Sequence, residues 1–130
     1  MELDDPAITI LLVEDDKILQ ELYVDRFKVA GLKVLQAFDG MQAMELLKAH
    51  PEIRLVMLDI MMPKMSGYDV LFQVRRNPAW KSLPVIIVSA LADIDDQAKG
   101  LQLGATDYIT KGETLPGEII EKIKKYALAP

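Results

Sequence analysis

Short apolar runs recur along the chain, and segments with apolar residues at helical spacing lie between them. The run LVML at residues 55–58 has no polar position, which is typical of a strand buried on both faces of a sheet. Segment 15–29 instead places Ile18, Leu22 and Phe27 on one side of a helix. The two patterns predict strands at residues 8–13, 33–37, 55–58, 85–88 and 106–109, and helices at residues 15–29, 40–49, 68–76, 93–103 and 117–128.

Glycine and proline mark the ends of these helices. Gly31 and Gly104 stand where a helix C-terminus is expected, and Asn77-Pro78 ends the third helix. Strands that alternate with helices are typical of an α/β fold with right-handed crossovers and a parallel sheet. We expect one domain over residues 8–128, preceded by a frayed N-terminus at residues 1–7.

Composition and charge limit the classes of protein to which the chain can belong. A chain of 130 residues with 51% hydrophobic residues is long enough for one well-formed core. The net charge of −5 argues against direct binding to nucleic acid. No apolar run approaches the roughly 18 residues of a membrane span, and no secretory leader is recognisable. With no cysteine for disulfides or thiolate metal sites, the sequence predicts a cytoplasmic protein without membrane partners.

The candidate chemistry lies at the carboxyl ends of the predicted strands, where ligands bind in such sheets. The polar residues at these ends are Glu14-Asp15-Asp16, Asp59, Ser89 and Lys111. Clustered carboxylates repel one another unless a cation neutralises them, and hard oxygen ligands with room for water suit Mg²⁺. A hydroxyl and a lysine nearby suit the oxygens of a phosphoryl group. The pattern therefore predicts a carboxylate that accepts a phosphoryl group beside a magnesium ion.

Each of these residues also has a purely structural interpretation. Asp15 or Asp16 is equally suited to cap the first helix, and isolated acidic residues are common in solvated loops. Met61, Met62 and Met65 fit a role as packing filler better than a recognition surface. The functional interpretation depends on complementary groups following four different strands.

Four segments resemble, in order and spacing, the receiver domain of two-component response regulators. ILLVEDD resembles the acidic pair of the first strand, and LDIMMPKMSG resembles the phosphoacceptor segment. PVIIVSA resembles the strand that carries the switch hydroxyl, and GATDYITK resembles the fifth strand with its aromatic residue and lysine. The resemblance implies a flavodoxin-like (βα)5 three-layer sandwich with a five-stranded parallel sheet in the order 2-1-3-4-5.

The resemblance implies a role for each residue of the acidic cluster. Asp59 would attack a phosphohistidine and become an aspartyl phosphate. Asp15 and Asp59 would ligate Mg²⁺ directly together with the main-chain carbonyl of Met61, and Glu14 would act through water. Lys111 would pair with the phosphoryl oxygens. Pro63 and Gly67 would shape the loop so that the carbonyl points inward.

The resemblance also implies partners and a switch. The phosphoryl donor would be a sensor histidine kinase or a phosphotransfer protein, and the chain would catalyse only its own phosphorylation and dephosphorylation. Ser89 would bind the phosphoryl group, and Tyr108 would turn inward behind it. This movement would change the face formed by the fourth helix, fifth strand and fifth helix. Charges on that face favour a homodimer on phosphorylation: Asp96, Lys99, Asp107, Lys122 and Lys125.

Two features bear on reactivity and loop conformation. Met61 and Leu91 take the positions that flank the path of hydrolytic water, and neither can activate water, so we expect a long-lived phosphorylated state. Gly112 stands where the family usually has a cis proline after Lys111, and a cis bond before glycine would cost about 2.5–4 kcal/mol.

Two other classes of function remain open. One is a pseudo-receiver that binds partners without being phosphorylated. The other is a magnesium-dependent phosphohydrolase of the haloacid-dehalogenase kind, which would carry an aspartate where this chain has Met61.

Overall fold

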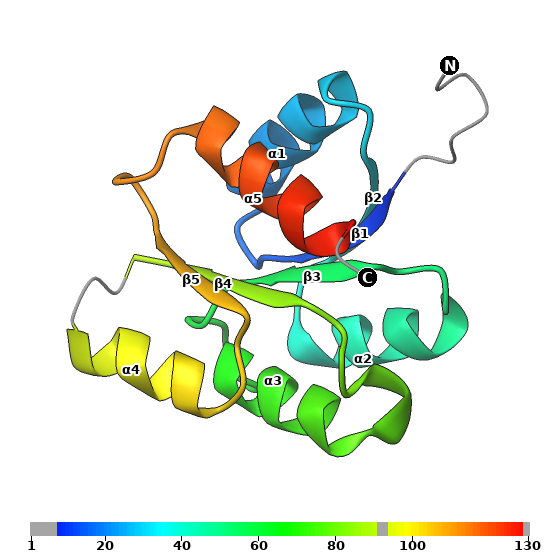
Figure 1. The fold of residues 1–130 in the computed structure, drawn as a ribbon, viewed down its shortest axis with the longest axis vertical. Helices are drawn as coiled ribbons and strands as arrows, with labels where there is room; N and C mark the ends of the chain where they lie inside the picture. The colour runs from blue at the N-terminus through cyan, green and yellow to red at the C-terminus, as the bar shows by residue number, and fades with distance from the viewer. Residues whose placement is uncertain (1–7, 91–93, 129–130) are drawn as a thin grey trace.

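The computed structural model describes residues 8–90 and 94–128, which form one five-stranded parallel sheet between two layers of helices (Figure 1). The strand order is β2-β1-β3-β4-β5, as the resemblance implied. The strands are β1 (Thr9–Val13), β2 (Lys33–Ala37), β3 (Leu55–Leu58), β4 (Val85–Ser89) and β5 (Asp107–Thr110). The helices are α1 (Lys17–Val29), α2 (Gly40–Ala49), α3 (Gly67–Arg76), α4 (Ile94–Gln102) and α5 (Pro116–Ala127), with the short 3-10 helix η2 (Pro78–Trp80).

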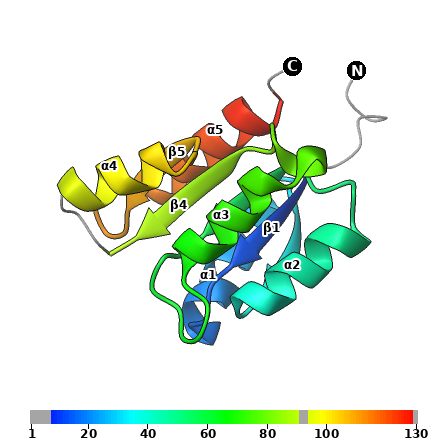
Figure 2. The same cartoon turned by 90° about the horizontal axis from the view of Figure 1, so that it is seen from below.

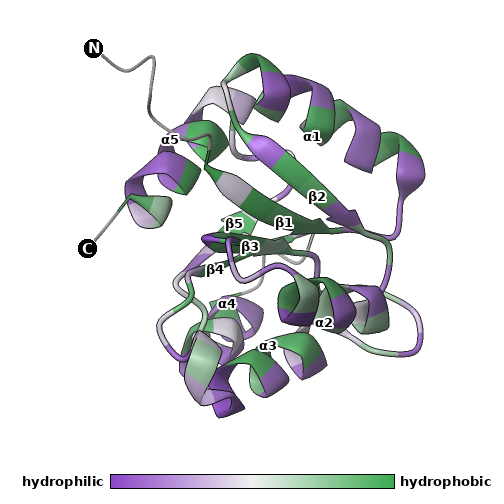
Figure 3. Ribbon diagram, turned by 90° about the vertical axis from the view of Figure 1, so that its right-hand side faces the viewer, coloured by the Kyte–Doolittle hydropathy of each residue, from purple (hydrophilic) through white to green (hydrophobic). Residues whose placement is uncertain are grey.

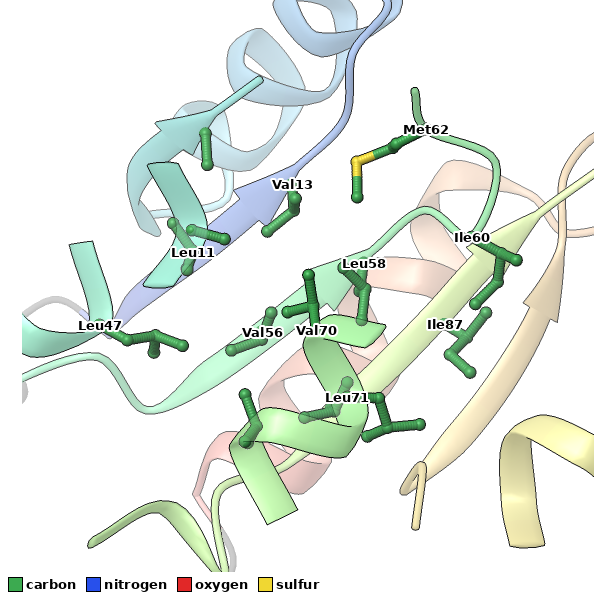
Figure 4. Close-up of a cluster of buried hydrophobic side chains, with 14 of the residues drawn as sticks. Leu11, Val13, Leu47, Val56, Leu58, Ile60, Met62, Val70, Leu71 and Ile87 are labelled. Atoms are coloured by element: carbon green, nitrogen blue, oxygen red, sulfur yellow. The ribbon is translucent and has the colours of Figure 1, made fainter. Parts of the chain in front are cut away.

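Helices α1 and α5 cover one face of the sheet, and α2, α3 and α4 cover the other (Figures 1 and 2). Each face holds its own hydrophobic cluster, since successive side chains of a strand point to opposite faces. Leu11 and Val13 pack with β3 and α3 on the α2–α3 side (Figure 4), while Ile10 and Leu12 face α1 and α5. Every residue of β3 is buried, which explains its uninterrupted apolar run. Colouring by hydropathy shows the same layout, with apolar central strands and polar outer faces on the helices (Figure 3).

Local chemistry sets the ends of α1. The helix begins at Lys17, two residues later than expected, because Asp16 has an extended backbone and its side chain accepts a hydrogen bond from the Leu19 N–H. Asp16 is therefore the helix cap that one interpretation of the sequence offered. At the other end Gly31 has φ 86°, and its N–H donates to the Lys28 carbonyl at 2.9 Å, as expected for a helix-closing glycine.

Other boundaries differ by one residue from the sequence prediction. Helix α3 starts at Gly67 because Ser66 and Asp69 cap it reciprocally. Strand β4 includes Ser89, and β5 runs one residue further than expected. The predicted start of the fourth helix at residue 93 lies outside the described residues. Helix η2 was not predicted. No helix within the described ranges has the length and apolar character to cross a membrane.

The sheet register brings the candidate residues to one edge. Val13 is the register partner of Leu58, so the residues that follow β1 and β3 leave the sheet side by side. Ser89 pairs with Thr110 in the same way, which places Lys111 beside the end of β4. Because all strands are parallel, their carboxyl ends share this edge, and the polar residues that follow them converge there.

Candidate functional site

Three carboxylates from two strand ends meet at this edge. Glu14 and Asp59 are buried, with 3% and 6% of their surface exposed, and Asp15 is exposed. One oxygen from each of Glu14, Asp15 and Asp59 lies within 4.8 Å of the other two. The structure thus brings together the three side chains that the sequence analysis singled out as metal ligands.

Lys111 is the cation that faces this cluster. Its Nζ lies 2.7 Å from Oε1 of Glu14 and 3.4 Å from Oδ2 of Asp59. The main-chain N–H of Lys111 donates to the Ser89 carbonyl at 2.8 Å, which holds the start of the loop in register with β4. Gly112 has φ 82°, and no peptide bond among the described residues is cis. The lysine therefore reaches the cluster without the usual proline, through a left-handed glycine turn.

Burial and charge act against each other in the cluster. Burial raises the pKa of Glu14 to about 7, although hydrogen bonds from Lys111 and from the Asp16 N–H act to lower it. Burial alone would lower the pKa of Lys111, but the hydrogen bond to Glu14 and the charge of Asp59 outweigh it and raise that pKa. Among the described residues, the Lys111 ammonium group is paired with two of the three carboxylates, Glu14 and Asp59, so the cluster is short of positive charge. Its hard oxygen donors fit a divalent cation such as Mg²⁺.

The loop after β3 is packed directly against Asp59. The Met61 N–H donates to Oδ1 of Asp59 at 3.3 Å, and the Gly67 N–H donates to the Ile60 carbonyl at 3.0 Å. A Cβ on Gly67 would overlap with the main-chain oxygen of Asp59 and lie 2.8 Å from Cα of Ile60. Only glycine allows the first turn of α3 to approach the acceptor so closely.

The three methionines of this loop have different environments. Met62 is buried in the hydrophobic cluster and Met65 packs partly buried against it, in agreement with the packing interpretation. Met61 is 60% exposed, so it does not fill the core. Leu91, the other residue expected to flank the path of water, lies outside the described residues.

Ser89 and Tyr108 lie on neighbouring strands next to the cluster. Ser89 is fully buried at the end of β4. The Tyr108 ring is partly buried and lies beside Gly100 of α4, where an added Cβ would stand 3.1 Å from Cδ2 of the ring. Burial raises the pKa of Tyr108, while a hydrogen bond with the Ser89 side chain lowers it. The two residues assigned to the switch therefore interact.

Charges on the α4–β5–α5 face pair within the chain. Nζ of Lys122 lies 2.8 Å from Oδ2 of Asp107, and the Tyr126 hydroxyl donates to the same oxygen at 2.8 Å. Nζ of Lys99 lies 4.4 Å from the centre of the Tyr68 ring. An interface that used Asp107 or Lys122 would have to compete with this internal pair.

Gln20 contributes to the site, although it was not among the residues predicted from the sequence. It is fully buried, and its Nε2 donates to the carbonyls of Glu14 and Ala37, both at 2.8 Å. Its Oε1 accepts from Nε2 of Gln36 at 2.6 Å. The side chain thereby ties the ends of β1 and β2 together next to the acidic pair. The sequence contains one indication of this role: Gln20 is a polar residue four positions before Val24, so it lies on the buried face of α1.

The model of the response regulator receiver domain family matches residues 10–124. The DNA-binding dual master transcriptional regulator RpaA of Synechocystis sp. is 37% identical over 103 residues, which are 78% of this chain and 42% of RpaA. The Francisella response regulator 1452 receiver domain aligns with a TM-score of 0.85 and 29% identity over 92% of this chain and 96% of that one. The Mn(2+)-bound form of response regulator Rcp1 aligns with a TM-score of 0.79 and 28% identity, covering 93% and 94% of the two chains.

The chain spans about two-fifths of the length of RpaA and of several other transcriptional regulators that it matches. The family match covers most of the chain, and it includes every residue of the acidic cluster together with Ser89, Tyr108 and Lys111. The strand order and the polar edge of the sheet agree with it. This chain belongs to the response regulator receiver domain family.

Proposed function

We propose that Asp59 is the phosphoacceptor, and that the donor is a phosphohistidine of a sensor histidine kinase or of a phosphotransfer protein. A carboxylate oxygen of Asp59 forms the new P–O bond while the P–N bond to the imidazole breaks, and the imidazole leaves with the electron pair of that bond. The observation that carries the proposal is the buried Asp59 carboxylate with Lys111 at 3.4 Å and two further carboxylates beside it. Such an arrangement acts through positioning and charge neutralisation.

We propose the metal ligands that the resemblance to receiver domains implies. Asp15 and Asp59 would hold Mg²⁺ directly with the main-chain carbonyl of Met61, and Glu14 would act through water. The bound ion supplies positive charge that offsets the oxygens of the incoming phosphoryl group. Support comes from the 4.8 Å grouping of the carboxylate oxygens. The Met61 N–H donates to Oδ1 of Asp59, so this residue lies next to the acceptor. The Mn²⁺-bound form of the similar protein Rcp1 also supports a divalent cation here.

Lys111 and Ser89 would hold the phosphoryl oxygens. Lys111 lies between Glu14 and Asp59, so its ammonium group needs only a small movement to exchange the Glu14 carboxylate for a phosphoryl oxygen. Ser89 would donate its hydroxyl hydrogen to another oxygen. That movement would end its present interaction with Tyr108 and let the ring move, which changes the surface of α4 and β5. The chain would act only on its own phosphorylation and on the loss of that group.

Intact mass spectrometry tests the proposal. The wild-type protein is incubated with Mg²⁺ and acetyl phosphate, and we expect a mass gain of one phosphoryl group. Asp59→Asn should abolish the gain, because an amide oxygen is a poor nucleophile. Asp25→Asn is the matched control, since Asp25 is exposed on α1 and belongs to no part of the cluster, and it should be phosphorylated like the wild type.

The two other classes of function are separate outcomes of the same experiment. Turnover of acetyl phosphate without a trapped adduct would identify a phosphohydrolase. Neither adduct nor turnover would identify a pseudo-receiver. Either result would contradict the assignment of Asp59 as a stable acceptor.

We further propose that the output depends on the α4–β5–α5 face, through a homodimer or a separate effector domain. RpaA is named as DNA-binding and is longer than this chain, which is consistent with an output domain outside the receiver. Light scattering with and without a beryllofluoride mimic of the phosphoryl group measures the homodimer. The internal pair of Asp107 and Lys122 competes with contacts across a dimer interface. If the mass does not change with the mimic, the signal passes to a different protein or domain and not to a second copy of the chain.

A further inference from the structure

Two adjoining hollows lie along α2, α3 and η2, away from the carboxylate cluster. One, of about 430 Å³, is bordered by residues that precede β3 and β4 and by the C-terminal end of α5, at the edge of the sheet opposite Asp59. The other, of about 720 Å³, lies between α2 and α3, which run side by side in Figure 2. Pro78 and Trp80 line both hollows. We call the combined region the Trp80 surface, and its principal side chains are Lys48, His50, Arg54, Phe72, Arg76 and Trp80.

The charge of the Trp80 surface differs from that of the whole chain. The sequence has 20 acidic and 15 basic residues, yet no carboxylate occurs among the described residues that line the two hollows. His50 contacts Glu52 at 3.1 Å, so the positive charge comes from Lys48, Arg54 and Arg76. In a protein with a net charge of −5, such a region favours a partner with negative groups.

Two aromatic rings add apolar contact area to this charge. Phe72 is 50% exposed on α3, and the Arg76 guanidinium carbon lies 5.3 Å from the centre of its ring. Trp80 is partly buried, packs against the core and borders both hollows. Exposed aromatic residues combined with arginine are the side chains that contribute most to binding in protein interfaces.

The segment that carries Trp80 is held rigidly. Nη1 of Arg75 donates to the carbonyls of Trp80 and Leu83, at 3.2 and 2.7 Å, and its Nε donates to the Gly104 carbonyl at 2.8 Å. The Asn77 side chain accepts from the Ala79 N–H, within η2, at 2.9 Å. A rigid surface loses little conformational entropy on binding, so its contacts contribute more fully to affinity.

We propose that the Trp80 surface binds an acidic peptide segment of a partner protein, which places a bulky apolar side chain between Phe72 and Trp80. The hollows are far larger than a single ion, and they adjoin each other at Pro78 and Trp80, which suits an extended chain. A peptide with a few carboxylates matches three cations. A nucleic acid carries a phosphate at every nucleotide, and these phosphates would be repelled by the acidic residues elsewhere on a protein with a net charge of −5. A short acidic peptide is therefore the better match.

Trp80 is the only tryptophan in the chain, so its fluorescence reports on this surface alone. The probes are the capped peptides DEFDE and DELDE and the charge-reversed peptide KKFKK. We expect a saturable change in emission with the acidic peptides, and none with KKFKK. The apparent affinity should fall several-fold when salt is raised from about 50 mM to about 500 mM, because the Debye length shortens.

Charge-reversal variants test the residues. Lys48→Glu with Arg76→Glu should weaken binding of the acidic peptides at least tenfold, and both side chains are exposed, so the fold should persist. The matched control is Lys28→Glu with Lys33→Glu, which changes the net charge equally on the exposed surface of α1 and β2 and should leave the affinity within twofold.

Four results would overturn the proposal. They are no saturable change with either acidic peptide at millimolar concentration, equal binding of KKFKK, equal loss of affinity in the control variant, and tighter binding of a single-stranded oligonucleotide than of DEFDE. A different occupant would be a second copy of the chain. Light scattering would then give a doubled mass for the wild type, and the Lys48→Glu, Arg76→Glu variant would return to the mass of a monomer.

Discussion

Replacing Gly67 by alanine tests how closely α3 must approach the phosphoacceptor. The added methyl group would overlap with the main-chain oxygen of Asp59 and lie 2.8 Å from Cα of Ile60, whereas ordinary contacts are 3.4–4 Å. All of the nearest atoms belong to the main chain, so no side-chain rotation relieves the contact. Either α3 or the loop after β3 must therefore move by more than half an ångström.

The expected size of the effect follows from two opposing contributions. Overpacking a well-packed site costs about 1–3 kcal/mol, and a contact with rigid main chain belongs at the upper end of that range. Replacing glycine lowers the entropy of the unfolded chain, which returns about 0.4–1 kcal/mol. We expect Gly67→Ala to lower the free energy of unfolding by about 2 kcal/mol. Displacement of Asp59 should also slow phosphorylation by acetyl phosphate about tenfold or more.

Gly117→Ala is the matched control, because it makes the same chemical change inside α5 with no atom within 4 Å of the new methyl group. Alanine favours a helix over glycine, so this variant should gain about 0.5–1 kcal/mol and be phosphorylated like the wild type. Urea unfolding and intact mass after acetyl phosphate treatment measure both effects. This prediction is refuted if the free energy of unfolding of Gly67→Ala lies within about 0.5 kcal/mol of the wild-type value, which is no more than the entropy contribution of roughly 0.4–1 kcal/mol, and if the variant is phosphorylated at the wild-type rate.

Three further predictions concern single residues of the site. Gln20→Leu removes the amide donor of the buried Glu14 carbonyl, and it should lower the free energy of unfolding, measured in urea, by about 1–3 kcal/mol. The control Gln36→Leu keeps the hydrogen bonds from Gln20 to the carbonyls of Glu14 and Ala37, so it should lower the free energy of unfolding by less than half as much. Burial raises the folded-state pKa of Glu14 from 4.5 to about 7, so between these pH values the metal-free folded protein binds more protons than the unfolded chain does. The free energy of unfolding in EDTA should therefore fall as the pH rises from about 5 to 7. Glu14→Gln should make the free energy of unfolding depend less on pH in this range. Met61→Asn should shorten the half-life of the phosphorylated protein after donor removal, because an exposed amide can orient water where methionine cannot, and an equal or longer half-life would contradict the role assigned to Met61.

Local patterns in the sequence were sufficient for the order and type of the elements. The apolar run of β3, the glycines that close α1 and α4, and Asn77 before Pro78 each act within a few residues, so the sequence alone reveals them. The sequence left Asp16 open between helix cap and site residue. The structure makes it the cap of α1, since its carboxylate accepts from the Leu19 N–H.

The convergence of carboxylates at one sheet edge was also predictable, because parallel strands bring their carboxyl ends together. The resemblance to receiver domains supplied the roles that the spacing alone does not contain. The effect of Gly112 was not predictable in the same way. Its conformation depends on a turn between β5 and α5, and the structure shows a left-handed glycine there with the lysine still in reach of Glu14.

Only the tertiary structure decided which distant side chains meet. Lys111 and Glu14 are 97 positions apart in the sequence, yet their charged groups lie 2.7 Å apart. Gln20 joins two strand ends through its amide, and the Trp80 surface joins α2, α3 and η2. The hydrophobic periodicity of a segment records which of its faces is buried, but not which residue of another segment lies against that face. Those pairings depend on strand register and helix packing, and they exist only once the chain has folded.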